Sequence, residues 1–333
     1  MSSYQPRNLD GRIKLIERPS GDHNSGGYGD VLTGSYVEEG EITKEVAIKI
    51  VRPRASKPDS VIPKKDRGPR REIRLWKFLV HPNIVPLLGL TTDFNHLNPF
   101  FSTRPVFPGM VSPWMKNGNL GAYSKNDHLE IADLLKLPPV LNIGVLIFIV
   151  LVQVKIDTKM LVHSKAVDVI HGDLTPGNVL IDDKGIACLT DFGLSTLRAG
   201  FENPSYWTST VGGAIRWRAP ELLPPFDWVA TVPYPAVLNT ACDIFSYGQI
   251  VLQVFSGHLP YYNIAHVHCI TMELYRRSAP RRPSASTSPK LTDEYWMLVQ
   301  KCWGQNLNPD TRPSAEGVHL LIFCFSCILV NAT

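Results

Sequence analysis

The most informative part of this sequence is His171-Gly172-Asp173-Leu174-Thr175-Pro176-Gly177-Asn178, which is followed after a short gap by Asp191-Phe192-Gly193. It supplies a carboxylate at Asp173, an amide at Asn178 and a second carboxylate at Asp191. Carboxylate and amide oxygens are ligands that suit Mg²⁺, and a carboxylate beside the ion can accept a proton. The pattern therefore predicts a magnesium site next to a proton acceptor.

The residues that separate Asn178 from Asp191 predict a β-hairpin. Apolar residues at 179–181 predict a short strand, Asp-Asp-Lys-Gly at 182–185 predicts a turn, and residues 186–190 predict the returning strand. Because the strands of a hairpin are antiparallel, we expect Asn178 and Asp191 to lie at the same end of it.

These segments resemble the catalytic loop and the metal-binding triplet of protein kinases, whose patterns are H-R-D-L-x-x-x-N and D-F-G. The resemblance implies that Asp173 accepts the proton of a protein hydroxyl and that Asn178 and Asp191 hold Mg²⁺. It also implies that ATP donates the phosphoryl group. In that family His171 supports the metal loop and is not a base.

A strand with strict alternation is predicted over residues 45–51. The branched residues at 46, 48 and 50 fall on one face, and Ala47 and Lys49 fall on the other. Lys49 matches the lysine of the kinase V-A-I-K motif, which contacts the α- and β-phosphates. By the same resemblance, Ala47 contacts the adenine.

Upstream, Asn24-Ser25-Gly26-Gly27-Tyr28-Gly29-Asp30-Val31 resembles the kinase loop G-x-G-x-x-G-x-V, with Asn24 in place of the first glycine. Glycines let the backbone N–H groups approach phosphate oxygens closely. The resemblance implies that Gly26, Gly27 and Gly29 cover the phosphates and that Val31 contacts the adenine.

Downstream, Ser112 aligns with the gatekeeper at the back of the kinase nucleotide site, and residues 113–115 align with the hinge. Trp114 and Met115 would then present backbone groups to the adenine edge. A small gatekeeper implies an open rear pocket.

Glu72 lies in a segment, residues 70–79, in which Ile73, Trp76 and Leu79 recur at helical spacing. A glutamate beside such an apolar stripe is ordinarily a solvated surface residue. Its position after Lys49 matches the helix of kinases whose glutamate pairs with the strand lysine, and this implies a Lys49–Glu72 ion pair.

Three segments nearer the C-terminus complete the resemblance. Residues 219–221 look like the A-P-E triplet, residues 243–248 like the start of the large buried C-lobe helix, and Cys302-Trp303 with Arg312 like the C-terminal signature. The family pairs this glutamate and arginine, which implies a structural ion pair between Glu221 and Arg312.

The matches follow kinase order over about residues 15–320 and look most like the tyrosine-kinase-like Ser/Thr group, including its fungal members. The implied fold is α+β and bilobal, with a small antiparallel-sheet N-lobe that carries one major helix and a larger helical C-lobe. The expected boundaries are a short N-terminal extension over 1–14, an N-lobe to about 112, a C-lobe over 113–320, and an apolar tail over 321–333.

Composition agrees with one kinase domain. The chain has 333 residues, of which 44% are hydrophobic, and a net charge of +4. Its six cysteines lack metal or disulfide spacing, and Cys324 and Cys327, which lie inside an apolar run, are expected to be buried thiols. The cysteine pattern and the lack of a signal sequence in the polar N-terminus predict a cytoplasmic location. The basic stretch 52–74 is interpreted as a solvated loop, so no nucleic acid is expected, and the protein is expected to be a monomer.

Several departures from the kinase pattern bear on activity. Gly172 replaces the arginine of H-R-D, which implies that no phosphorylated segment is needed there. Thr175 replaces the lysine of Ser/Thr kinases, Gly177 replaces the arginine of tyrosine kinases, and Ala214 replaces a threonine that contacts that lysine. The sequence favours an active enzyme of reduced rate, with Ser/Thr as the acceptor.

Two alternatives stay open at this point. The first is a pseudokinase that binds ATP and acts as a scaffold. The second is a small-molecule kinase of the aminoglycoside type, which shares the H-G-D sequence; the segments at 219–221, 243–248 and 312 argue against it because they serve a protein-substrate site.

Apolar runs at 143–152 and 318–330 fit this pattern poorly. Both are shorter than the roughly 20 residues that cross a bilayer, so buried C-lobe helices are favoured over membrane contact. Translated intron sequence is a third explanation.

Overall fold

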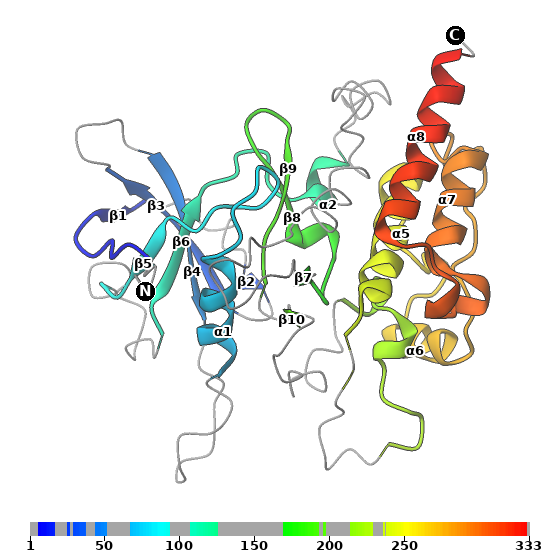
Figure 1. Cartoon of the computed structure of the whole chain (residues 1–333), viewed down its shortest axis with the longest axis horizontal. Coiled ribbons are helices and arrows are strands. Elements are labelled where there is room, and N and C mark those ends of the chain that lie inside the picture. Colours follow the sequence, from blue (N-terminus) through cyan, green and yellow to red (C-terminus); the bar gives the residue numbers. More distant parts are fainter. Residues whose placement is uncertain are drawn as a thin grey trace. The chain divides into compact units, whose positions relative to one another are not determined.

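The computed structural model describes residues 6–16, 25–26, 29–37, 44–51, 67–93, 107–125, 169–192, 196–197, 214–228, 236 and 238–331. The chain divides into two compact units, Met1–Lys116 and Asn117–Thr333. The first carries the large sheet and the second carries most of the helices (Figure 1). Each unit is described by itself below.

The first unit is built on an antiparallel sheet of six strands in the order β1-β3-β4-β6-β5, with β2 paired to β3. Its elements are β1 (Ile13–Leu15), β2 (Ser25–Gly26), β3 (Gly29–Tyr36), β4 (Lys44–Val51), α1 (Arg67–Trp76), β5 (Gly89–Thr91) and β6 (Gly109–Pro113).

Strand β4 confirms the alternation read from the sequence. Val46, Ile48 and Ile50 are buried, whereas Ala47 and Lys49 on the other face are only half-buried. The three buried residues pack with Leu9, Leu32, Tyr36 and Val111 in the core of this sheet. Burial of branched side chains on one face fixes the register of β4, since a slip of one residue would expose them all.

Residues of the expected N-terminal extension take part in this packing. The backbone N–H of Leu9 donates to the Leu90 carbonyl (2.8 Å), and Leu90 donates to the Arg7 carbonyl (2.9 Å). The Asp10 carboxylate then accepts hydrogen bonds from the Thr91 hydroxyl (2.9 Å) and from both the backbone (2.6 Å) and the hydroxyl (2.8 Å) of Thr92. The N-terminal segment is thus attached to β5 and to the residue that follows it.

We expect Asp10→Ala to lower the melting temperature at neutral pH and to have little effect in acid. Partial burial raises the pKa of Asp10, but the hydrogen bonds from Thr92 and Thr91 outweigh it and leave the pKa below its ordinary value of 3.8. A carboxyl whose pKa is lowered by folding stabilises the protein above its unfolded pKa, and the stabilisation is lost as the pH falls through the folded pKa.

Thermal unfolding of both proteins from pH 7 downward checks this expectation. The difference in melting temperature should narrow below about pH 4. Asp227→Asn, at an exposed residue, is the matched control. A difference that stays constant with pH would contradict the role of the Asp10 carboxylate.

The predicted helix around Glu72 is present, but it ends sooner than the apolar spacing indicates. α1 stops at Trp76; Leu79 is still buried, whereas Val80 is 91% exposed. The Trp76 indole donates to the Val85 carbonyl (2.6 Å) and so holds the chain that turns back behind the helix. Pro82 also disfavours helical geometry at His81.

The second unit combines short strands with a helical core. Its elements are α2 (Leu120–Tyr123), β7 (Val169–Ile170), the 3₁₀ turn η3 (Pro176–Asn178), β8 (Val179–Ile181), β9 (Ala187–Leu189), β10 (Thr196–Leu197), η5 (Ala214–Arg216), η6 (Pro220–Leu222), α5 (Thr240–Ser256), α6 (Val267–Tyr275), α7 (Asp293–Trp303), η7 (Gln305–Leu307), η8 (Pro309–Thr311) and α8 (Ala315–Asn331). Strand β7 pairs with β10, and β8 pairs with β9.

Helix α5 is buried from Cys242 to Ser256, as predicted for the large C-lobe helix. The Asn239 side chain caps its N-terminus by accepting from Cys242 N (3.0 Å), and Gly257 ends it with φ 71°. Helix α7 approaches closely at Gly248, where an added Cβ would lie 2.8 Å from the Cys302 Cβ. Polar residues of α5 such as Asp243, Gln249 and Gln253 are buried as well, so this helix is covered all round and not only where α7 packs against it.

The apolar run at 318–330 forms the greater part of α8. Val318 and Ile322 are buried, whereas Leu320, Phe323 and Cys324 are exposed. The expectation that Cys324 is a buried thiol is therefore wrong, because it lies on the outer side of the helix. Among the described helices, none has both the length and the hydropathy needed to cross a bilayer. The run at 143–152 lies outside the described residues.

Candidate active site

In the first unit, an ion pair joins the strand lysine to the helix glutamate. The Lys49 ammonium lies 2.7 Å from Glu72 Oε1, and the two side chains are only 15% and 5% exposed. Glu72 is therefore not a solvated surface residue. A buried carboxylate requires a partner, and this pair holds the Lys49 ammonium in one place on the half-buried face of β4.

Other predicted nucleotide contacts share that face. Cross-strand partners in a sheet point to the same side. The register pairs Val31 with Lys49 and Ala47 with Ser112, so these four side chains lie together on one face. Ser112 is buried at the end of β6, and Trp114 and Met115 follow that strand directly.

The glycine-rich segment forms the β2–β3 hairpin, in which Gly26 pairs with Gly29. Both glycines therefore lie at the N-terminal end of β3, close to Val31. Gly27 lies outside the described residues.

In the second unit, His171 supports the loop that carries Asp173. The buried imidazole accepts from the Asp173 backbone N–H through Nδ1 (3.3 Å), and its Nε2 lies 3.0 Å from the Thr190 carbonyl. Its ring packs against Phe192, with ring centroids 5.3 Å apart. Both ring nitrogens are used within the loop region, so the supporting role predicted for His171 is confirmed.

The hairpin places Asn178 and Asp191 at the same end, as expected. Val179 pairs with Leu189, and the Thr190 N–H donates to the Asn178 carbonyl (3.0 Å), so Asp191 follows directly on the facing strand. Asn178 Nδ2 donates to the Asp173 carbonyl (2.8 Å), which leaves the amide oxygen as its metal-ligating atom. An amide oxygen and a carboxylate suit Mg²⁺, so the donor set fits that ion.

Asp191 itself has a left-handed backbone, with φ 63°. This conformation is uncommon for a residue with a side chain, although Asp adopts it more readily than most residues. Backbone strain of this kind persists where the surrounding structure fixes it, and it is concentrated at functional sites.

The loop at 171–173 is attached to helix α5 by one carboxylate. Buried Asp243 accepts from the backbone N–H groups of His171 (2.7 Å) and Gly172 (2.9 Å). Burial raises the pKa of Asp243, although nearby His171 and the two backbone donors act in the opposite direction. Gly172 has φ 77°, a conformation that suits glycine. The residue that replaces the usual arginine therefore relieves backbone strain at the turn.

Arg218 lies beside Asp173 and is not among the site residues predicted from the sequence. The guanidinium of Arg218 lies 4.0 Å from Asp173 Oδ1, with side-chain exposures of 4% and 13%. Arg218 follows η5 and stands directly before the Ala219-Pro220-Glu221 segment. The sequence shows only one arginine among many, and its burial beside Asp173 depends on the tertiary fold.

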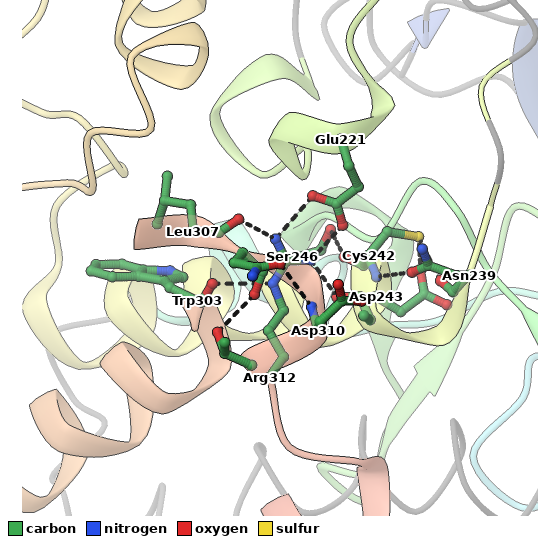
Figure 2. A network of polar contacts seen from close by, with 12 residues as sticks. Glu221, Asn239, Cys242, Asp243, Ser246, Trp303, Leu307, Asp310 and Arg312 are labelled. Carbon is green, nitrogen blue, oxygen red and sulfur yellow. Dashed lines mark hydrogen bonds and ion pairs between the residues drawn. The ribbon is translucent and has the colours of Figure 1, made fainter. Parts of the chain in front are cut away.

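The predicted Glu221–Arg312 ion pair is present, and Figure 2 shows its surroundings. Arg312 binds both carboxylate oxygens, with Nη2 at 2.9 Å from Oε2. It also donates to the carbonyls of Trp303 (3.1 Å), Ala241 (2.9 Å) and Leu307 (3.1 Å). The pair therefore ties η6 to the start of α5 and to the segment that follows α7.

A cavity of about 580 Å³ borders the loop after Asp173. It is lined by Thr175, Pro176 and Gly177 of that loop, by residues in and beside α2 that include Asn119 and Lys125, and by Trp217 and Gln253. Trp217 donates its indole N–H to the Gln253 side chain (3.1 Å), which fixes that wall. The cavity therefore offers space beside Thr175, two residues after Asp173.

A sheet unit that carries a buried Lys–Glu pair, together with a helical unit that carries the H-x-D, Asn and D-F-G groups, defines a protein kinase domain. The sequence model described as protein tyrosine and serine/threonine kinase matches residues 22–322. The chain belongs to this family, and the predicted α+β kinase fold is confirmed.

Similar curated proteins are named as kinases. Serine/threonine-protein kinase STY17 of Arabidopsis thaliana is 27% identical over 300 residues, which cover 89% of this chain and 42% of the relative. Dual specificity protein kinase shkA of Dictyostelium discoideum is 28% identical over 258 residues, 75% of this chain and 40% of the relative. Serine/threonine/tyrosine-protein kinase HT1 of Arabidopsis thaliana is 25% identical over 297 residues, 88% of this chain and 62% of the relative. The chain thus spans about two fifths of the length of the first two.

Proposed function

We propose that this protein transfers the γ-phosphoryl group of ATP to a hydroxyl of a protein substrate. The observation that carries the proposal is that kinase groups in both units are held by contacts of their own: Lys49 by Glu72, and Asn178 by the backbone of Asp173. Phosphoryl transfer asks a protein mainly to position groups and to neutralise charge, and these contacts provide positioning.

Each group has a defined task in this proposal. Lys49 binds the α- and β-phosphates, and Asp173 accepts the hydroxyl proton while that oxygen forms its bond to the γ-phosphorus. The bond from the γ-phosphorus to the bridging oxygen breaks, and ADP leaves. Mg²⁺, when bound by Asn178 and Asp191, neutralises phosphate charge. Gly26, Gly27 and Gly29 cover the phosphates, and Val31, Ala47, Ser112, Trp114 and Met115 contact the adenine.

The same proposal includes the acceptor residue, the kinase group, the cellular location, the oligomeric state and the domain bounds. The acceptor is Ser or Thr, in keeping with the names of several relatives. The protein belongs to the tyrosine-kinase-like group in its fungal form, acts inside the cell in signalling, and is a monomer. Its kinase domain covers about residues 15–320, with the boundary between the two lobes near residue 112 and an apolar tail over 321–333.

The proposal is tested with purified protein, Mg·ATP and a generic basic protein substrate, compared with Asp173→Asn. We expect the variant to lose about 10²–10⁴-fold in transfer rate, the usual contribution of a positioned general base. It should still bind Mg·ATP. Equal rates in the two proteins would remove Asp173 from its role, and nucleotide binding without any transfer would establish the scaffold alternative.

The buried gatekeeper leads to a separate prediction. We expect Ser112→Phe to abolish inhibition by bulky ATP-competitive compounds, because the new ring fills the space beside Ala47 on the same face of the sheet. The measurement is the inhibitor concentration that halves transfer, with Ser112→Ala as the matched small-residue control. Unchanged inhibition in the Phe variant would show that residue 112 does not border the inhibitor site.

A further inference from the structure

We infer that Arg218 is a positioning residue for Asp173 and supplies the cation that the catalytic loop lacks at position 175. The inference rests on the proposed function. Its basis is the contact between the Arg218 guanidinium and Asp173 Oδ1, 4.0 Å apart with both side chains largely buried.

Burial strengthens the electrostatic attraction between the two side chains. Exposed ion pairs contribute little because water screens them and both side chains stay mobile. Here the exposures are 4% and 13%, so the attraction acts in a medium of lower dielectric constant.

The surrounding segment fixes where this charge lies. The backbone N–H of Arg218 donates to the Ile215 carbonyl (3.3 Å). Ala219 and Pro220, which follow it, are buried. Glu221, three residues on, is held by Arg312. A guanidinium on so constrained a backbone can hold the Asp173 carboxylate in one orientation toward the acceptor hydroxyl.

The contact also accounts for two departures in the sequence. Thr175 and Ala214 stand where Ser/Thr kinases have a lysine and its threonine partner, and both are absent from this chain. The Arg218 guanidinium reaches Asp173 from the segment that contains Ala214. A positive charge is thus retained beside the proton acceptor, but it comes from a different element.

The structure allows the positive charge to be moved from position 218 to position 175. Thr175 lines the cavity of about 580 Å³, so a lysine side chain has room there. The test compares Arg218→Gln, Arg218→Lys and the double variant Arg218→Gln/Thr175→Lys in the 333-residue chain. Arg276→Gln is the matched control, because Arg276 forms only an exposed pair with Glu273 (66% and 27% exposed).

We expect Arg218→Gln to lower kcat about 10²-fold, the effect of a misplaced reacting group, with the KM for ATP unchanged. Arg218→Lys should retain most of the activity. The double variant Arg218→Gln/Thr175→Lys should have a kcat at least about tenfold higher than that of Arg218→Gln. A purely structural role would not predict recovery from position 175. Folding is followed for each variant by thermal unfolding.

Three outcomes would overturn the inference. They are an unchanged or higher kcat in folded Arg218→Gln, a raised KM for ATP in place of a lowered kcat, and a folded double variant without recovery. If Arg218→Gln does not fold, Arg218→Lys decides: a folded variant that has lost activity as completely as Asp173→Asn also overturns it.

If the wild-type protein transfers no phosphate at all, the proposed function fails and the pair is tested on its own. The shifts in melting temperature of Arg218→Lys, Asp173→Asn and their combination are then compared. Residues in contact give non-additive effects. Additive shifts would show that the two side chains do not interact, and non-additive shifts would support the pair independently of catalysis.

Discussion

Lys49→Ala is expected to lower kcat for phosphoryl transfer by about 10²–10³-fold, the usual effect of removing one preorganised group at a developing charge. The ammonium lies 2.7 Å from Glu72 Oε1 and shares its face of the sheet with Val31, Ala47 and Ser112. Its removal leaves the phosphates without this cation and leaves a buried carboxylate without this partner.

A graded series separates these two effects. Glu72→Gln keeps an oxygen that can accept from Lys49 but removes the charge, so it should cost less activity than Lys49→Ala. Lys14→Ala, an exposed lysine on β1 of the same sheet, is the matched control and should leave the rate unchanged. Steady-state kinetics with varied ATP gives kcat and KM for each. Full activity of Lys49→Ala would disprove the assigned role.

Arg312→Ala is expected to have the largest effect on stability, lowering the free energy of unfolding of the second unit by about 3–5 kcal/mol. The Arg312 side chain is 0% exposed and bonds to Glu221 and three backbone carbonyls. Its loss leaves the Glu221 carboxylate, which is 14% exposed, without its partner. Unpaired buried charge is far more costly than a lost surface contact.

Urea unfolding of the purified variant measures this loss. Glu221→Gln, which keeps one acceptor oxygen, should cost less than Arg312→Ala. Arg276→Ala breaks an exposed pair in the same unit and should change the free energy of unfolding by less than about 1 kcal/mol. If Arg312→Ala were no more damaging than Arg276→Ala, the Glu221–Arg312 pair would not be a structural link.

Local geometry explains which parts of the site could be predicted. Asn178 and Asp191 meet because the intervening strands and turn form a hairpin, and hairpins are encoded by neighbouring residues. The faces of β4 follow from alternation alone. The Lys49–Glu72 and Glu221–Arg312 pairs, in contrast, join distant segments, and only the resemblance to a family predicted them.

Features that depend on tertiary packing were missed or misjudged. Arg218 meets Asp173 because the tertiary fold buries the segment around Ala219 and brings Arg218 to that carboxylate, and no pattern in the sequence marks this. α1 ends at Trp76 because the indole bonds to Val85 and Pro82 follows, although the apolar spacing continues to Leu79. Cys324 is exposed because a helix with apolar residues all round has only one side covered.

The two hydrogen bonds that the backbone N–H groups of His171 and Gly172 donate to Asp243 have a consequence for regulation. They fasten the Asp173 loop to the most deeply enclosed helix of the second unit, so moving the loop would require disturbing the middle of that unit. We therefore expect any regulatory movement to involve elements other than the loop at 171–173, such as α1.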